Sequence, residues 1–123
     1  MLPLRITILS IWVVCWVPLL GCSRRTAAPV TSLPQYHGQS RRAVESALGK
    51  PTRTDKYPMS QAVGEMRAPL FNAYPTSNPA NANVPIEESW WKDGDYWITL
   101  WFHQVNGQWV VLDSCRWHKD VRF

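Results

Sequence analysis

The sequence predicts an α+β domain in which one or two short N-terminal helices pack on a three-stranded antiparallel β-meander. In the last third of the chain, three runs rich in Trp, Tyr, Val and Ile are separated by one Asp-Gly pair and one Asn-Gly pair. Such pairs are strong hairpin signals because their residues tolerate positive φ. A segment with helical spacing of apolar residues and a capping residue at each end precedes these runs. A chain of 123 residues has room for one such domain.

The start of the chain resembles a bacterial lipoprotein signal. Arg5 precedes an apolar run of about 15 residues, which is shorter than the roughly 20 needed for a membrane-spanning helix. The run ends in Leu19-Leu20-Gly21-Cys22, which resembles a lipobox. The resemblance implies that residues 1–21 are a signal peptide and that Cys22 carries lipid, and several acyl chains on one residue give a firm anchor. An uncleaved membrane anchor and an ordinary cleaved signal are the alternatives.

The expected location follows from this signal. We expect an exported protein that is anchored to a membrane by lipid. Ser23, next to the expected lipidated cysteine, resembles the pattern that permits release to the outer membrane in bacteria with two membranes. The expected position is therefore the outer membrane, facing the periplasm.

The residues that follow the signal are predicted to form a flexible tether over residues 22–36. This stretch has few large aliphatic residues, and its composition cannot bury enough surface to offset chain entropy. The predicted domain then covers residues 37–123. Its only thiol is that of Cys115, so no internal disulfide is expected and the domain must be held by its core.

The first predicted helix lies between Gly38 and Pro51. Ser40 is placed to cap its first turn, Gly49 suits the position just after the helix, and Pro51 prevents continuation. Its apolar face comprises Ala43, Val44, Ala47 and Leu48.

The region between this helix and the strands gives weaker signals. A second short helix is predicted over Ser60 to Arg67, although Gly64 disfavours it by about 1 kcal/mol relative to alanine. Residues 68–85 mix four Pro with four Asn, and we expect a disordered loop rather than a functional one. Leu70, Phe71 and Tyr74 are the residues of this loop that can pin it to the domain.

The predicted strands are Glu88 to Lys92, Tyr96 to His103 and Trp109 to Trp117. If Asp93-Gly94 is a two-residue turn, Trp91 pairs with Tyr96. Side chains alternate across a sheet, so one face, expected under the helix, carries Trp91, Tyr96, Ile98, Leu100 and Phe102. The opposite face carries Trp90, Trp97, Thr99, Trp101 and His103. The third strand adds either Trp109 and Trp117 or Val110 and Leu112 to this Trp-rich face, and the sequence leaves that register open.

The Trp-rich face is the strongest candidate for a functional surface. If it is exposed, Trp90, Trp97 and Trp101 are the expected binding residues, because exposed aromatic patches mark interaction sites. If residues 70–74 fold across it, the same tryptophans are core. The two alternatives stand equally. An envelope protein and a glycan are the expected classes of partner, since tryptophan can stack on sugar rings.

Part of this pattern resembles a known family. The run Gly38-x-Ser40, Val44 and Leu48-Gly49-x-Pro51, followed by a Trp-rich strand and two more strands joined at Asn106-Gly107, is similar to the small SmpA/OmlA (BamE-type) lipoproteins. The resemblance covers roughly residues 38–117 and implies a helix-helix-three-strand fold. It also implies an envelope lipoprotein that assists outer-membrane assembly. β-Lactamase-inhibitor-like relatives of this family bind enzymes through the sheet, so a binding role rather than catalysis is implied.

No catalytic site, metal site or cofactor is predicted. Cys115 and His118 are three residues apart, and such positions on a strand point to opposite faces. The acids near the first hairpin, Glu87, Glu88, Asp93 and Asp95, are expected to be solvent-exposed. A net charge of +4 without a basic stripe does not indicate a nucleic-acid partner. The prediction is a non-enzymatic binding or assembly module. The alternatives are a glycan-binding or inhibitor-like lipoprotein and, less favoured, a small thiol- or carboxylate-dependent hydrolase.

Overall fold

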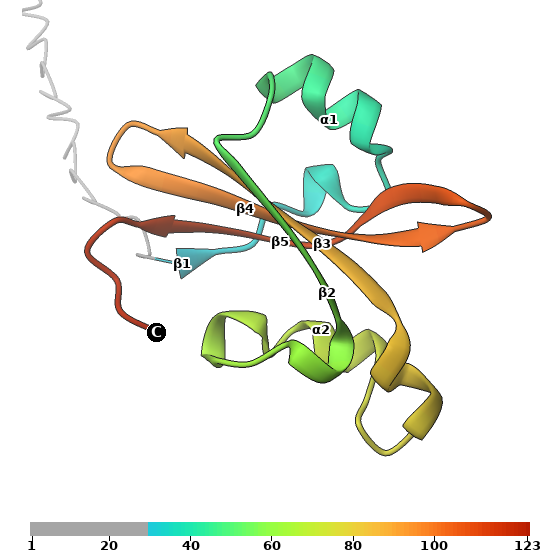
Figure 1. The fold of residues 1–123 in the computed structure, drawn as a ribbon. Coiled ribbons are helices and arrows are strands. Elements are labelled where there is room, and N and C mark those ends of the chain that lie inside the picture. The colour runs from blue at the N-terminus through green and yellow to red at the C-terminus, as the bar shows by residue number, and fades with distance from the viewer. Residues whose placement is uncertain (1–29) are drawn as a thin grey trace, which may run out of the picture.

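The computed structural model describes residues 30–123, which form a five-stranded antiparallel sheet with helices on both faces (Figure 1). The predicted α+β class is therefore confirmed. The signal peptide of residues 1–21 and the lipidation site Cys22 lie outside the described residues. The strand order is β1-β5-β4-β3-β2. The elements are β1 (Val30–Thr31), α1 (Arg41–Leu48), β2 (Arg53–Pro58), α2 (Leu70–Ala73), β3 (Pro85–Asp93), β4 (Tyr96–Val105) and β5 (Gln108–His118).

Helix α1 forms where the sequence predicts it. The Ser40 hydroxyl accepts a hydrogen bond from the Ala43 N–H at 3.1 Å, and Gly49 ends the helix with φ of 77°. Val44 is fully buried, and Leu48 packs at the edge of the same core. This core contains the residues predicted to lie under the helix, namely Trp91, Ile98, Leu100 and Phe102. Ala43 and Ala47 are exposed, so the buried face of α1 is narrower than predicted.

The meander of β3, β4 and β5 is also confirmed, with a correction at the first turn. Asp93 pairs with Tyr96, so the two turn residues are Gly94 and Asp95 rather than Asp93 and Gly94. Trp91 therefore opposes Ile98 instead of Tyr96. The pairing moves by two residues, which leaves every side chain on its predicted face because the side-chain period of a strand is two.

The second hairpin turn lies at Asn106 and Gly107, as predicted. Val105 pairs with Gln108, and both turn residues have positive φ, 51° and 77°. A β-bulge then interrupts β5. Trp101 pairs with Asp113, whereas its neighbour Phe102 pairs with Val111. The bulge reverses the alternation of side chains within the strand.

This bulge settles the register that the sequence left open. Trp117 pairs with Trp97 on the Trp-rich face, whereas Trp109 packs against the core under α1. Leu112 packs on the Trp-rich side. Neither sequence alternative therefore holds along the whole of β5, because each assumed a regular strand.

The sheet has five strands rather than the predicted three. Strand β2 pairs along its whole length with β3, and β1 pairs with the end of β5. β2 reads Arg-Thr-Asp-Lys-Tyr-Pro. Its charges and final proline are typical of a protected edge strand, and it has no apolar alternation that would predict a strand. β1 lies inside the tether expected over residues 22–36. Leu33 and Tyr36 also pack on the core under α1, so that prediction was wrong for residues 30–36.

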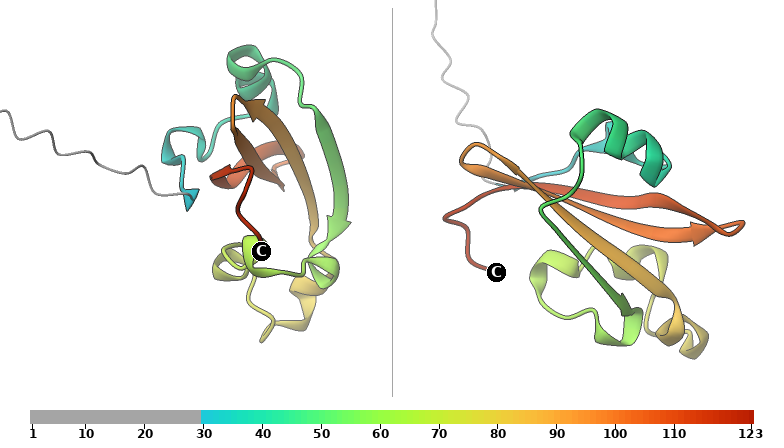
Figure 2. Two further views of the ribbon diagram at one scale, coloured as in Figure 1. Left: turned by 90° about the vertical axis from the view of Figure 1, so that its left-hand side faces the viewer. Right: turned by 45° about the horizontal axis from the view of Figure 1, so that its top comes forward.

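Residues 59–84, here called the covering segment, lie on the face of the sheet opposite α1 (Figures 1 and 2). The single helix predicted over Ser60 to Arg67 is instead two 3₁₀ turns, Met59–Gln61 and Glu65–Arg67, separated by Gly64 with φ of 92°. The loop of residues 68–85, expected to be disordered, forms α2 and a further 3₁₀ turn, Pro79–Asn83. Leu70 is fully buried in the core and anchors this otherwise polar stretch to the sheet.

Within residues 30–123, no helix is both long enough and apolar enough to cross a membrane.

Candidate functional site: a tryptophan patch above a buried glutamate

The Trp-rich face is covered in one part and open in another. Trp101 is fully buried and packs with Met59, Ala62 and Leu70 of the covering segment. Trp90 and Trp97 lie beyond that segment and are half-buried. Trp101 is therefore a core residue and is not available as the exposed binding residue that the sequence allowed. Trp90 and Trp97 remain candidates.

The rings of this open part hold one another in place. The centroid of Trp90 lies 5.9 Å from that of Trp97 and 5.7 Å from that of Trp117, both edge-to-face. Trp97 and Trp117 are stacked with their centroids 6.2 Å apart. These separations lie in the favourable range for aromatic pairs, each worth about 0.5–1.5 kcal/mol beyond burial. The exposed faces of Trp90 and Trp97 are therefore fixed by neighbours rather than free to rotate.

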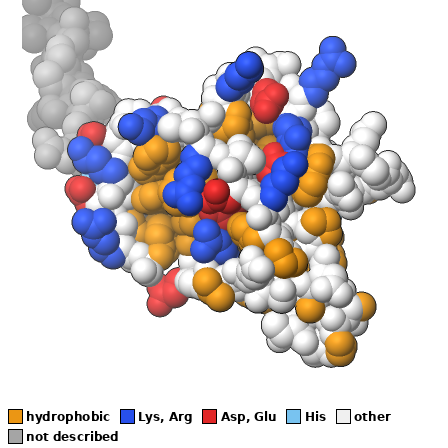
Figure 3. Space-filling view, in the orientation of Figure 1, with side chains coloured by type: hydrophobic (Ala, Val, Ile, Leu, Met, Phe, Trp, Pro, Cys, Tyr) orange, Lys and Arg blue, Asp and Glu red, His pale blue; other side chains and the backbone are white. Residues whose placement is uncertain are grey.

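Two cations lie over these rings. The Arg53 guanidinium is 5.3 Å from the Trp90 centroid, and the Lys92 ammonium is 5.4 Å from the Trp97 centroid. We call these four residues the aromatic patch. Figure 3 shows hydrophobic side chains gathered on the left of the view with Lys and Arg side chains around them. A cation within about 6 Å of a tryptophan is attracted by the ring, so the patch combines apolar area with positive charge.

Glu88 lies beneath the patch and is fully buried. Its carboxylate accepts hydrogen bonds from the two tryptophan N–H groups of Trp90, at 2.8 Å, and Trp101, at 2.7 Å. Arg67 of the covering segment donates two more, at 2.8 and 3.0 Å, and the Tyr57 hydroxyl donates another. Glu88 thereby links the covering segment, the core tryptophan and one tryptophan of the patch.

The charge state of Glu88 follows from these contacts. Burial alone raises the pKa of a carboxyl group, but the hydrogen bonds from Arg67, Tyr57 and Trp101 outweigh it and lower the pKa of Glu88 below its ordinary value. Burial, together with the neighbouring Glu88 carboxylate, raises the pKa of Tyr57 well above its ordinary value. Glu88 is therefore ionised and Tyr57 neutral at neutral pH, which is the arrangement in which both make their hydrogen bonds.

Glu87 mirrors Glu88 on the other face of β3. It is 2% exposed and forms an ion pair with Arg41 of α1. The Lys56 ammonium lies 3.6 Å from the same carboxylate. Each of the two glutamates is thus paired with an arginine on its own side of the sheet, Glu87 with Arg41 of α1 and Glu88 with Arg67 of the covering segment. The expectation that Glu87 and Glu88 are solvent-exposed was wrong. Their position between the apolar residues Ile86 and Trp90 was the feature of the sequence that could have indicated burial within a strand.

Glu87, Glu88 and Cys115 are the described residues that bear on the hydrolase alternative. Adjacent strand residues point to opposite faces, so Glu87 and Glu88 do not form a carboxylate pair. Cys115 is 8% exposed and belongs to the core, which confirms that it packs as a small apolar residue. Burial, with a smaller effect of Asp113, raises the pKa of its thiol to about 11. A thiol in this state is protonated at neutral pH and is a weak nucleophile.

One cluster of polar residues was not found from the sequence. His37 Nε2 lies 2.8 Å from the Ser114 hydroxyl and 3.5 Å from an Asp113 carboxylate oxygen. A Ser-His-Asp triad needs the serine and the carboxylate on different ring nitrogens, whereas here both meet the same one. The Ser114 hydroxyl also accepts a hydrogen bond from the Leu33 N–H at 2.8 Å. The cluster therefore joins the start of the domain to β5, and its members are too far apart in the chain for a local motif.

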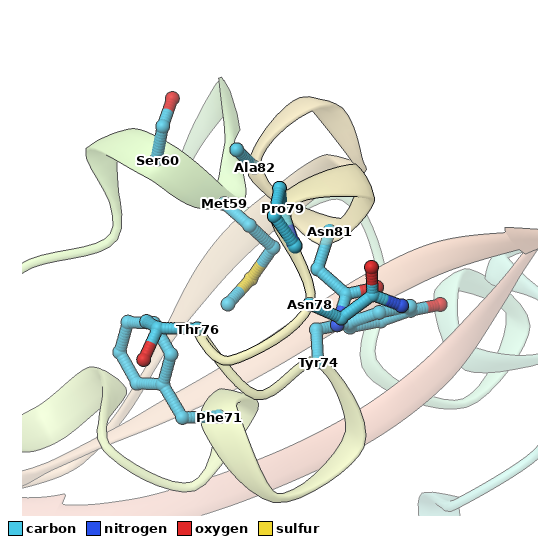
Figure 4. Close-up of a pocket in the computed structure, with 9 residues that line it drawn as sticks. All are labelled: Met59, Ser60, Phe71, Tyr74, Thr76, Asn78, Pro79, Asn81 and Ala82. Atoms are coloured by element: carbon cyan, nitrogen blue, oxygen red, sulfur yellow. The ribbon is translucent and has the colours of Figure 1, made fainter.

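The described residues form no metal-binding cluster, and the covering segment holds a small cavity. Within residues 30–123, no group of three or more His, Cys, Asp or Glu side chains is placed to hold a metal ion. A cavity of about 100 Å³ lies inside the covering segment, where Met59 projects between Phe71 and Tyr74 (Figure 4). Its volume is below the roughly 300–1,000 Å³ usual for a small-molecule site, so it is not a candidate binding site.

No protein-family model, curated protein or solved structure matches this chain. The resemblance to SmpA/OmlA lipoproteins therefore stays a prediction based on the residues quoted above.

Proposed function

We propose that this protein is a lipid-anchored bacterial envelope lipoprotein that acts as a non-enzymatic binding or assembly module, and that the aromatic patch is its binding surface. One observation carries the proposal. Trp90 and Trp97 stay partly exposed although a covering segment buries the rest of their face. Both rings are held by Trp117, and Trp90 also donates a hydrogen bond to Glu88. A surface that is exposed and rigid at once is suited to recognition.

The energetics of binding favour such a patch. Trp and Arg are enriched among the residues that dominate interface energy, and single anchors often contribute about 2 kcal/mol or more. Ordering side chains on binding costs about 0.5–1.5 kcal/mol for each flexible group. The rings of Trp90 and Trp97 are already ordered by their neighbours, so binding of a partner does not have to order these two side chains.

The two cations favour a protein partner that offers carboxylates. Arg53 and Lys92 lie over the ring faces on which a sugar would stack, so a glycan would have to displace them. An acidic protein surface would instead pair with them while apolar side chains meet the tryptophans. Binding of a glycan is the second candidate. Crosslinking the lipoprotein in the cells that produce it identifies a protein partner, and pulldown on purified peptidoglycan tests the glycan.

The lipid anchor is tested by Cys22→Ser. We expect this change to abolish labelling with fatty acid and partition into detergent, because no other residue in the motif can be acylated. The near-ultraviolet circular dichroism of the domain should be unchanged, since every packed residue named above lies at position 30 or later. Lipid label that persists on the Cys22→Ser protein would refute the lipoprotein proposal.

A further inference from the structure

A second apolar surface lies beside the aromatic patch, at the edge where β1 begins. Val30 is 40% exposed and sits opposite Trp117 in the sheet, and Phe123 is 49% exposed with its ring 5.5 Å from that of Trp117. Both residues line a shallow hollow of about 360 Å³, together with the apolar Met66 and Pro69 and the acids Glu65 and Asp113. We call Val30, Trp117 and Phe123 the edge strip. Two of the four exposed large hydrophobic residues of the described chain thus meet in one place.

The position of this strip along the chain indicates what covers it. Val30 is eight residues after Cys22. An extended chain spans at most about 3.6 Å per residue, so eight residues reach about 29 Å. This is close to the diameter of a domain of this size, whose radius of gyration is about 12 Å. If Cys22 carries the lipid, the start of β1 stays within about 29 Å of the bilayer, so the edge strip can reach its surface.

The chemistry of the strip suits the membrane interface. Val30 and Phe123 are the exposed members of the strip, whereas Trp117 is only 8% exposed. Binding at the membrane interface scales with the apolar area that enters it. Charge contributes little, because Lys119 is paired with Asp95 at 3.2 Å and the exposed Asp120 lies between Lys119 and Arg122. The apolar side chains therefore carry the contact. A short tether also raises the effective concentration of the bilayer at this edge, so a weak contact suffices to hold the domain there.

We propose that the edge strip rests in the headgroup layer of the membrane that carries the anchor, so that the domain lies on the bilayer rather than hanging free from it. The proposal relies on the proposed lipidation of Cys22. It leaves the aromatic patch beside the bilayer for a partner. The β4–β5 turn lies at the opposite end of the sheet from β1 and the C-terminal end, so it would point away from the lipid (Figure 1).

The test uses the full-length lipidated protein in vesicles of phosphatidylethanolamine and phosphatidylglycerol. A nitroxide is attached at Arg122→Cys, or at Gln104→Cys as the control at the far end of the sheet. Cys22 is blocked by lipid and Cys115 is buried, so neither competes for the label. We expect the nitroxide at 122 to be more accessible to oxygen, which partitions into lipid, and less accessible to a water-soluble nickel complex than the nitroxide at 104.

Two further variants make the result specific. Phe123→Ser, added to Arg122→Cys, should return the accessibility at 122 to that at 104, whereas Val105→Ser should leave it unchanged. Equal accessibility at 122 and 104 in protein that floats with the vesicles would overturn the docking proposal. Shielding at 122 that occurs only in native membranes would overturn it as well, because a partner protein would then cover the strip. Protein that does not float with the vesicles would refute the lipid anchor instead.

Discussion

Arg67→Ala is expected to lower the free energy of unfolding by about 3–5 kcal/mol, because it leaves the ionised Glu88 carboxylate buried without its cation. Glu88 is fully buried and receives two of its hydrogen bonds from Arg67. Arg42→Ala is the matched control, since Arg42 is exposed on α1 and makes no ion pair with residues 30–123. It should change stability by no more than about 0.5 kcal/mol. Urea denaturation measures both, and equal costs would contradict the buried ion pair.

The same ion pair predicts a loss of stability in acid. The pKa of Glu88 is lower in the folded protein than in the unfolded chain, so the unfolded state binds the proton first as the pH falls. The contribution of Glu88 is therefore complete above the ordinary glutamate value of about 4.3 and is lost as the pH falls through the lower folded value. Glu88→Gln should remove this part of the pH dependence, which denaturation between neutral and acidic pH measures.

Trp101→Thr is expected to cost about 3–5 kcal/mol, in the range for large-to-small changes at fully buried aromatic residues. Trp101 is completely buried between the sheet and the covering segment, and its N–H donates to Glu88 at 2.7 Å. The substitution therefore opens a cavity and removes a hydrogen bond from a buried charge. Trp97→Thr should cost less, because Trp97 is only partly buried and threonine keeps strand propensity. Similar denaturation midpoints for the two variants would show that the Trp-rich face is evenly covered.

The parts of the fold that follow local chemistry could be predicted from the sequence. Ser40 and Gly49 delimit α1, and Asn106-Gly107 forms the second hairpin turn, because each depends on one residue's hydrogen bond or φ. The faces of β3 and β4 followed from alternation alone. The first turn was misplaced by one residue since Gly94 can begin a turn as well as end one.

The parts that depend on distant residues were missed. β2 forms because its backbone pairs with β3, whereas its own charged sequence shows no strand pattern. Residues 68–85 fold because Leu70 finds a buried position against Trp101, which composition could not show. Glu88 was predicted to be solvent-exposed because its partner Arg67 lies 21 residues away, and nothing local to Glu88 indicates that pairing.

Only part of the proposed binding site could be predicted from the sequence. Trp90, Trp97 and Trp101 were correctly placed on one face by alternation. Which of them is covered depends on where the covering segment ends, and no local signal carries that information. The bulge at Leu112 likewise decides that Trp117 joins Trp97 while Trp109 does not. The division of one aromatic face into core and patch is therefore a tertiary property.

The most direct test of the binding surface is the yield of crosslinked partner in cells that make Trp97→Thr. Trp109→Thr is the matched control, because Trp109 is also half-buried with cations over its ring but lies on the other face of the sheet. We expect Trp97→Thr to fold and to lose most of the crosslinked product, and Trp109→Thr to retain it. An undiminished yield from stably folded Trp97→Thr would contradict the account.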